Sequence, residues 1–138
     1  MILDRKINIV IPTVDFGVLI EMWKSVGSYN DKNLVKYPER QVFPKNLPKA
    51  VDEILKKFKD ESIIIETHSQ DLVNYFRYLV FKGKVKPNEI VINYDDGGDE
   101  FIEIFINERS KFTNKDNEVI KFPSGFFDVV LDELVEMM

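Results

Sequence analysis

The run of isoleucines at 63–65, followed at once by Glu66-Thr67-His68-Ser69, is the feature that most constrains this chain. A short, unbroken apolar run is typical of a strand that is buried on both faces, as in a parallel sheet. Residues 70–82 then change to helical spacing. A buried strand that ends in polar residues before a helix places those residues at the carboxyl edge of a sheet, where α/β proteins bind ligands.

The residues before this strand predict four further elements. Alternating isoleucines indicate a strand over 6–12 that Pro12 ends. Apolar residues at helical spacing indicate helices over 18–26 and 46–58. Residues 34–37 predict only a short, weak strand, because two prolines follow closely.

The residues after it predict a helix, a hairpin and a last helix. Ser69 is a good cap for the helix over 70–82, and Gly83 is a good stop. Strands over 89–94 and 100–107 flank Asp95-Asp96-Gly97-Gly98-Asp99, a strong turn signal that we interpret as a solvated hairpin turn. Residues 109–117 read as a polar loop, 119–122 as a short strand, and a last helix starts at Ser124 or Asp128. The order predicts an α/β fold with a mostly parallel sheet, flanking helices and an antiparallel hairpin extension.

Composition sets limits on the class of protein. The 138 residues predict one domain, 1–138, and the lack of cysteine excludes disulfides and thiolate metal sites. A net charge of −5 argues against a broad grip on nucleic-acid phosphates. No apolar run reaches the roughly 18 residues of a membrane span. We expect a cytoplasmic domain with no metal and no cofactor.

The strand and its polar end also resemble a known family. Ile63-Ile64-Ile65-Glu66-Thr67-His68-Ser69 is similar to the switch-histidine segment of ABC-type ATPase heads, nearest to the overcoming-lysogenization-defect-like and SMC-like AAA ATPases. Four other stretches look like family landmarks in family order. They are the signature region at 15–18, the Walker B strand and its continuation at 34–44, and two later landmarks at 84–87 and 122–128. The resemblance implies the C-terminal lobe of such a head, half of a P-loop NTPase fold.

The departures from the family pattern carry as much information as the matches. No Gly-x-x-x-x-Gly-Lys-Ser/Thr phosphate loop is present. Leu19 and Ile20 stand where the signature has Ser and Gln, and Lys36 and Tyr37 stand where Walker B has two acids. Those acids hold the Mg²⁺ shell and position the attacking water. The resemblance therefore implies that this domain alone is not an enzyme and does not hydrolyse ATP.

His68 and Glu66 then become vestigial nucleotide-site positions, together with Lys36, Tyr37 and Leu19. His68 and Glu66 each also have a structural interpretation. His68 fits a strand-to-helix turn, and Glu66 fits a hydrogen-bonded carboxylate at a strand end.

The resemblance also bears on the order of the strands. The family's Walker A strand normally lies between the strands at 62–66 and 89–94. Without it, these strands either pair directly, which we expect, or leave a seam that a partner fills by strand addition.

Three functions follow as hypotheses. The first is a non-catalytic interaction module that binds or modulates a full-length ABC-type ATPase, as a phage or mobile-element mimic acting on a defence system would. The second is a nucleotide-binding subunit that a partner lobe completes, and the third is a small nucleic-acid accessory protein. Phe16, Ile20 and Trp23 are the candidate partner-binding residues, although Trp23 also fits a core position, and a homodimer is an alternative partner.

Overall fold

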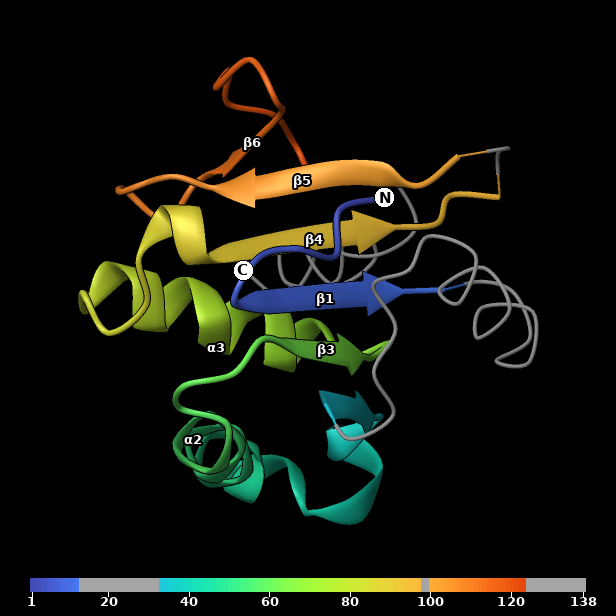
Figure 1. Ribbon diagram of the computed structural model, residues 1–138. Helices are drawn as coiled ribbons and strands as arrows, with labels where there is room; N and C mark the ends of the chain where they lie inside the picture. The colour runs from blue at the N-terminus through green and yellow to red at the C-terminus, as the bar shows by residue number, and fades with distance from the viewer. Residues whose placement is uncertain (13–32, 98–99, 124–138) are drawn as a thin grey trace, which may run out of the picture.

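The computed structural model describes residues 1–12, 33–97 and 100–123 (Figure 1). The predicted helix over 18–26 and the predicted last helix lie outside the described residues. Leu19, Phe16, Ile20 and Trp23 lie outside them too.

A mixed six-stranded sheet forms the centre of the structure, in the order β2-β3-β1-β4-β5-β6 (Figure 1). The pairings of β2 with β3, β3 with β1 and β1 with β4 are parallel, and those of β4 with β5 and β5 with β6 are antiparallel. This confirms an α/β fold. The strands are β1 Ile7–Ile11, β2 Leu34–Lys36, β3 Ile63–Glu66, β4 Ile90–Tyr94, β5 Ile102–Ile106 and β6 Phe112–Thr113.

The position of β1 corrects one prediction. β3 and β4 do not pair directly, and no seam lies between them, because β1 pairs in parallel with both. Ile9, for example, is opposite Ile65 on one side and Ile92 on the other. All five residues of β1 are buried, which suits the middle of a sheet better than an edge. β1 therefore occupies the position in the sheet between β3 and β4.

Two longer helices follow the predicted pattern. Helix α2 spans Leu47–Lys57 with Pro48 in its first turn, and α3 spans Gln70–Phe81. The Ser69 hydroxyl accepts a hydrogen bond from the Leu72 N–H over 3.0 Å, so the predicted cap is confirmed. Gly83 follows α3 with φ 74°, a conformation that glycine adopts without strain. Short 3₁₀ helices, Pro38–Gln41, Pro44–Asn46 and Pro87–Glu89, join the main elements.

Both helices contribute to one continuous core on one face of the sheet. The alternate residues of β1, β3 and β4 supply the sheet side of this core, and Phe76 of α3 is among its largest fully buried side chains. Burying apolar surface of this kind contributes roughly 25 cal/mol per Å². The sheet residues are Ile7, Ile9, Ile11, Ile63, Ile65, Ile90, Ile92 and Tyr94.

Two buried asparagines hold the N-terminal segment, residues 1–6, near the sheet (Figure 1). The Asn93 amide accepts from the Ile2 N–H and donates to the Ile2 carbonyl, each over 2.8 Å. The Asn8 amide makes the same two bonds with Arg5, at 2.9 and 2.7 Å. Leu3 packs in a small second core cluster with Val10 and Ile64. These buried amides therefore have partners, as buried polar groups require.

The β4–β5 hairpin confirms the turn signal between these two strands, but one of its acids is not solvated. Asp95 is buried, and its carboxylate accepts from the Gly97 N–H over 2.9 Å, so this acid is part of the turn rather than solvated.

The segment after β5 differs from the sequence prediction. The expected polar loop at 109–117 contains the strand β6. The expected strand over 119–122 is reduced to a single bridge between Thr113 and Val119.

Candidate functional site at the carboxyl edge of the sheet

The ends of β2 and β3 bring together most of the predicted site residues. Lys36 is the last residue of β2 and lies in register with Glu66, the last residue of β3. Tyr37 and His68 follow these strands directly. The structure thus gathers Lys36, Tyr37, Glu66 and His68 at one edge, as parallel strands dictate.

Tyr37 is hydrogen-bonded to Glu66 through both its side chain and its backbone. The Tyr37 hydroxyl donates to Glu66 Oε1 over 2.7 Å, and the Tyr37 N–H donates to the Glu66 carbonyl over 2.7 Å. Tyr37 has φ 46° and ψ 59°, the left-handed region that a bulky residue rarely adopts. Strain of this kind persists only where surrounding contacts fix it, and these two bonds are such contacts.

Glu66 is fully buried, and burial raises the pKa of its carboxyl above the ordinary value. The Tyr37 hydroxyl and the positive charges of Lys36, His68 and Arg40 lower that pKa, but burial is the larger effect. The second oxygen, Oε2, has no hydrogen-bond partner among the described residues. Burial and the neighbouring Glu66 in turn raise the pKa of Tyr37. The pair therefore favours a neutral tyrosine and a carboxyl group that resists ionisation.

Glu39 organises the turn between β3 and α3. One of its oxygens accepts from the Thr67 hydroxyl over 2.8 Å, and the other accepts from the His68 N–H over 3.0 Å. The Thr67 hydroxyl also accepts from the Ser69 N–H over 3.0 Å. Both carboxylate oxygens of Glu39 are thus used within the protein. The sequence alone assigns no role to Glu39, because neither Glu39 nor its partner Thr67 belongs to a recognisable local pattern.

His68 is exposed, yet its ring is anchored. Nε2 lies 2.6 Å from the Pro12 carbonyl oxygen, and because a carbonyl only accepts, Nε2 carries the proton in this contact. The imidazole also lies near the Tyr37 ring, with 5.2 Å between centroids. His68 therefore ties the turn after β3 to the residue after β1.

Positive charge surrounds the buried carboxyl. The Arg40 guanidinium lies 3.8 Å above the Tyr37 ring, a cation–π contact that sequence reasoning missed. Lys36 and His68 are the other two groups whose charge lowers the pKa of the Glu66 carboxyl. Within the described ranges no group of three or more His, Cys, Asp or Glu could hold a metal ion. The residues here do not fit the Mg²⁺ shell of a phosphoryl-transfer site, which needs acids directed at the metal.

Aromatic residues also lie on the outer side of α3. Tyr75 and Tyr78 stack on each other with 6.0 Å between ring centroids, and the Tyr75 hydroxyl donates to Asp52 over 2.7 Å. Burial and this hydrogen bond raise the pKa of Tyr75 to about 12. Tyr78 and Phe81 are exposed. The Tyr75 hydroxyl is thus engaged within the protein, whereas the rings of Tyr78 and Phe81 face solvent.

Comparisons with family models, curated proteins and solved structures found no match to this chain. In the part of the chain that the structure describes, none of the helices has the length and apolar character needed to cross a membrane. The fold and the site together define an α/β domain whose sheet edge carries a carboxyl–tyrosine–histidine cluster in which most polar groups are bonded to one another.

Proposed function

We propose that this chain is a non-catalytic, ATPase-like interaction module that binds or modulates a full-length ABC-type ATPase. Phosphoryl transfer depends on positioning and on neutralisation of charge at the phosphate and the metal. The polar residues at the carboxyl edge of this sheet instead form hydrogen bonds with each other. A scaffold that keeps its shape while its polar groups are internally bonded is suited to binding a protein partner.

The observation that carries the proposal is the bond between Tyr37 and Glu66. In the family pattern, the position of Tyr37 belongs to an acid that orients the attacking water. Here the hydroxyl donates to Glu66 Oε1 over 2.7 Å. The pKa of Tyr37 is raised, so the hydroxyl stays protonated and cannot accept a proton from water. Glu66 is buried behind it. Neither residue is available to a nucleotide without breaking this pair.

The contact between His68 and Pro12 supports the same conclusion. In the family, the switch histidine contacts the γ-phosphate. In this chain the Nε2 of His68 contacts the carbonyl of Pro12, the residue that follows β1. A backbone acceptor within the domain thus takes the hydrogen bond that a phosphate would take.

The main alternative is a nucleotide-binding subunit that a partner lobe completes. A seam between β3 and β4 would have given a partner strand a place to insert. Because β1 already pairs with both strands, a partner strand has no place there. A partner lobe would have to supply its phosphate loop from outside the sheet, which makes this alternative weaker.

Affinity capture followed by an activity assay tests the proposal. Tagged protein is expressed in its native host, and the recovered proteins are identified by mass spectrometry. We expect an ABC-type ATPase whose ATP turnover changes when the purified chain is added. Trp23→Ala, at a sequence-predicted contact, should reduce capture, whereas Phe43→Ala should not, although Phe43 is 74% exposed. Recovery of no ATPase, or an unchanged turnover rate, would contradict the proposal.

A further inference from the structure

A second candidate surface lies at the end of α3, away from the Glu66 cluster. Helix α3 starts after β3 at the carboxyl edge of the sheet and runs back toward the opposite edge (Figure 1). Two aromatic side chains near its end are exposed, Phe81 with 70% of its surface and Tyr78 with 50%. Residues three apart are neighbours on a helix, so these two rings lie side by side. Adjacent exposed apolar side chains, unlike single ones, are a feature of interaction surfaces.

The turn after α3 has a fixed backbone. The Lys84 N–H donates to the Leu79 carbonyl over 2.9 Å, which closes the end of the helix. Gly83 has φ 74°, the left-handed conformation that ends many helices. Val85 is buried in the core and anchors the turn from the other side. The surface is therefore organised before any partner binds, which reduces the entropy lost on binding.

Three lysines place positive charge beside the two rings. Lys82, Lys84 and Lys86 are all exposed, and residues 78–86 contain no acid. Lys82 follows Tyr78 by four residues and so lies on the same face of the helix. An exposed lysine keeps its charge in water and turns easily toward an anion. The end of α3 thus combines apolar contact area with positive charge.

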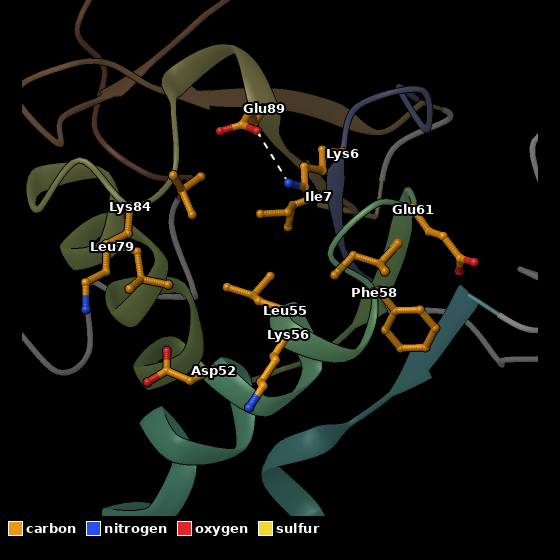
Figure 2. A pocket seen from close by; sticks show the side chains of 12 residues that line it. Lys6, Ile7, Asp52, Leu55, Lys56, Phe58, Glu61, Leu79, Lys84 and Glu89 are labelled. Atoms are coloured by element: carbon orange, nitrogen blue, oxygen red, sulfur yellow. Dashed lines mark ion pairs between the residues drawn. The ribbon is translucent and has the colours of Figure 1, made fainter.

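An acid beside this surface is already engaged. Asp52 of α2 accepts from the Tyr75 hydroxyl over 2.7 Å, and the Tyr75 ring stacks on Tyr78 with 6.0 Å between centroids. Figure 2 shows the pocket next to α3, with the Asp52 carboxylate between Lys56 and Lys84. Asp52 therefore supports the tyrosine stack from the α2 side. One carboxylate among these lysines leaves the surface with a net positive charge.

The small extent of the positive charge favours a short acidic segment of protein over a nucleic-acid strand. Single-stranded nucleic acid binds along a positive groove that follows its backbone for several nucleotides. Here the lysines are confined to one end of α3, and the first turn of the helix carries Asp71. The net charge of −5 also repels a long polyanion. A short segment avoids most of this repulsion, because charges more than about 8 Å apart are screened at physiological salt.

We propose that this surface binds a short acidic segment of a protein partner. A large apolar side chain of the segment packs on Tyr78 and Phe81, and its carboxylates pair with Lys82, Lys84 and Lys86. The inference rests on the proposed function, because it names a surface through which the interaction module contacts a partner. The two fail separately: a peptide titration measures this surface, whereas affinity capture measures whether the partner is an ATPase.

An NMR titration with the peptide acetyl-EEDLFEED-amide tests this surface. We expect saturable shifts at the amides of Tyr78, Phe81 and Lys84, and smaller shifts at His68. A peptide with amides in place of all its acids, and one with two serines in place of its apolar pair, should each bind about fivefold more weakly. No saturable shift, equal binding of the three peptides, or tighter binding of a twelve-nucleotide oligothymidylate would overturn the proposal.

An aromatic variant tests the apolar half of the surface. Phe81→Ala should weaken peptide binding about fivefold, because the partner's apolar side chain loses its main contact. Phe43→Ala is the matched control, since Phe43 is 74% exposed and belongs to a different part of the chain, before α2. Both rings are exposed, so both variants should fold. Equal affinities for the two variants would contradict a role for Phe81.

Charge variants test the other half. Lys82→Gln combined with Lys84→Gln should weaken peptide binding about fivefold, a modest loss because exposed ion pairs are screened by water. Lys45→Gln combined with Lys59→Gln removes the same charge from exposed positions outside α3 and its turn, and should leave the affinity unchanged. Equal affinities for the two double variants would show that the lysines after α3 do not select the acidic segment.

Discussion

Tyr37 donates two hydrogen bonds to Glu66, one from its hydroxyl to Oε1 and one from its backbone N–H to the carbonyl, each 2.7 Å long. These bonds fasten the end of β2 to the end of β3. They also join two positions that, in the function we propose, no longer serve a nucleotide. The pair explains how a bulky residue with φ 46° and a buried carboxyl group can coexist at this edge.

Removal of the Tyr37 hydroxyl should destabilise the protein. Tyr37→Phe leaves Glu66 Oε1 without its donor in a buried position, which costs about 1–3 kcal/mol. Urea unfolding measures the change. Tyr78→Phe is the matched control: Tyr78 is half exposed, and its hydroxyl makes no hydrogen bond within the described ranges. Its effect should stay within about 0.5 kcal/mol. Equal losses for the two variants would contradict the structural importance of the pair.

Stability should depend on pH through Glu66. Burial raises the pKa of this carboxyl in the folded state above its ordinary 4.5, so the folded protein retains a proton that the unfolded chain releases. The resulting stability is complete below pH 4.5 and is lost as pH rises through the folded-state pKa, by at most about 1.4 kcal/mol per pH unit.

Glu66→Gln tests this dependence, because glutamine is neutral at every pH. The unfolding free energy of the variant should rise relative to that of the unaltered protein as pH increases from 4 to 8. Glu53→Gln, at an exposed position on α2, should show no such trend. A constant difference between Glu66→Gln and the unaltered protein across this range would show that Glu66 ionises as easily in the folded state as in the unfolded chain.

The N-terminal segment should depend on Asn93. Asn93→Ala removes the two 2.8 Å bonds to the Ile2 backbone and should cost about 1–3 kcal/mol. Hydrogen exchange at the Ile2 amide should accelerate strongly, while exchange within α3 changes only as much as global stability does. Asn46→Ala is the control, because Asn46 is exposed and makes no capping bond. Unchanged exchange at Ile2 would mean that other contacts hold the segment.

Arg77 should not be replaceable by lysine. Its Nε donates to the Ser110 carbonyl over 2.9 Å, its guanidinium lies 4.5 Å from the centroid of the Phe112 ring, and the Ser110 hydroxyl donates to the Arg77 carbonyl over 2.8 Å. Arg77→Lys keeps the charge but loses the planar group, and should cost about 1–2 kcal/mol in thermal or urea unfolding. Arg109→Lys, at an exposed position, should be neutral. A neutral Arg77→Lys would show that α3 and the β5–β6 turn do not depend on this contact.

Local patterns predicted most of the elements that the structure describes. The apolar spacing of α2 and α3 and the Asp-Gly turn between β4 and β5 placed these elements within one or two residues. The Ser69 cap was also correct, because capping depends on residues three apart. The strand β6 was missed because Phe112–Thr113 is too short to show alternation, and it forms only through pairing with β5.

The order of the strands could not be derived from the same patterns. Periodicity in Ile7–Ile11 indicates a buried strand but not its neighbours. The predicted direct pairing of β3 with β4 was therefore wrong, because β1 lies between them. The meeting of Lys36, Tyr37, Glu66 and His68 was predictable, because parallel strands end at one edge. Arg40 over the Tyr37 ring and the His68 contact with Pro12 depend on loop geometry that no local pattern encodes.

The central claim is that the carboxyl edge of this sheet does not support ATP hydrolysis. ATP turnover by the purified chain with Mg²⁺ tests this claim most directly. We predict a phosphate-release rate equal to that of a buffer blank and the same for the unaltered protein, Glu66→Gln and His68→Ala. Turnover above the blank that disappears in Glu66→Gln or His68→Ala would contradict the account.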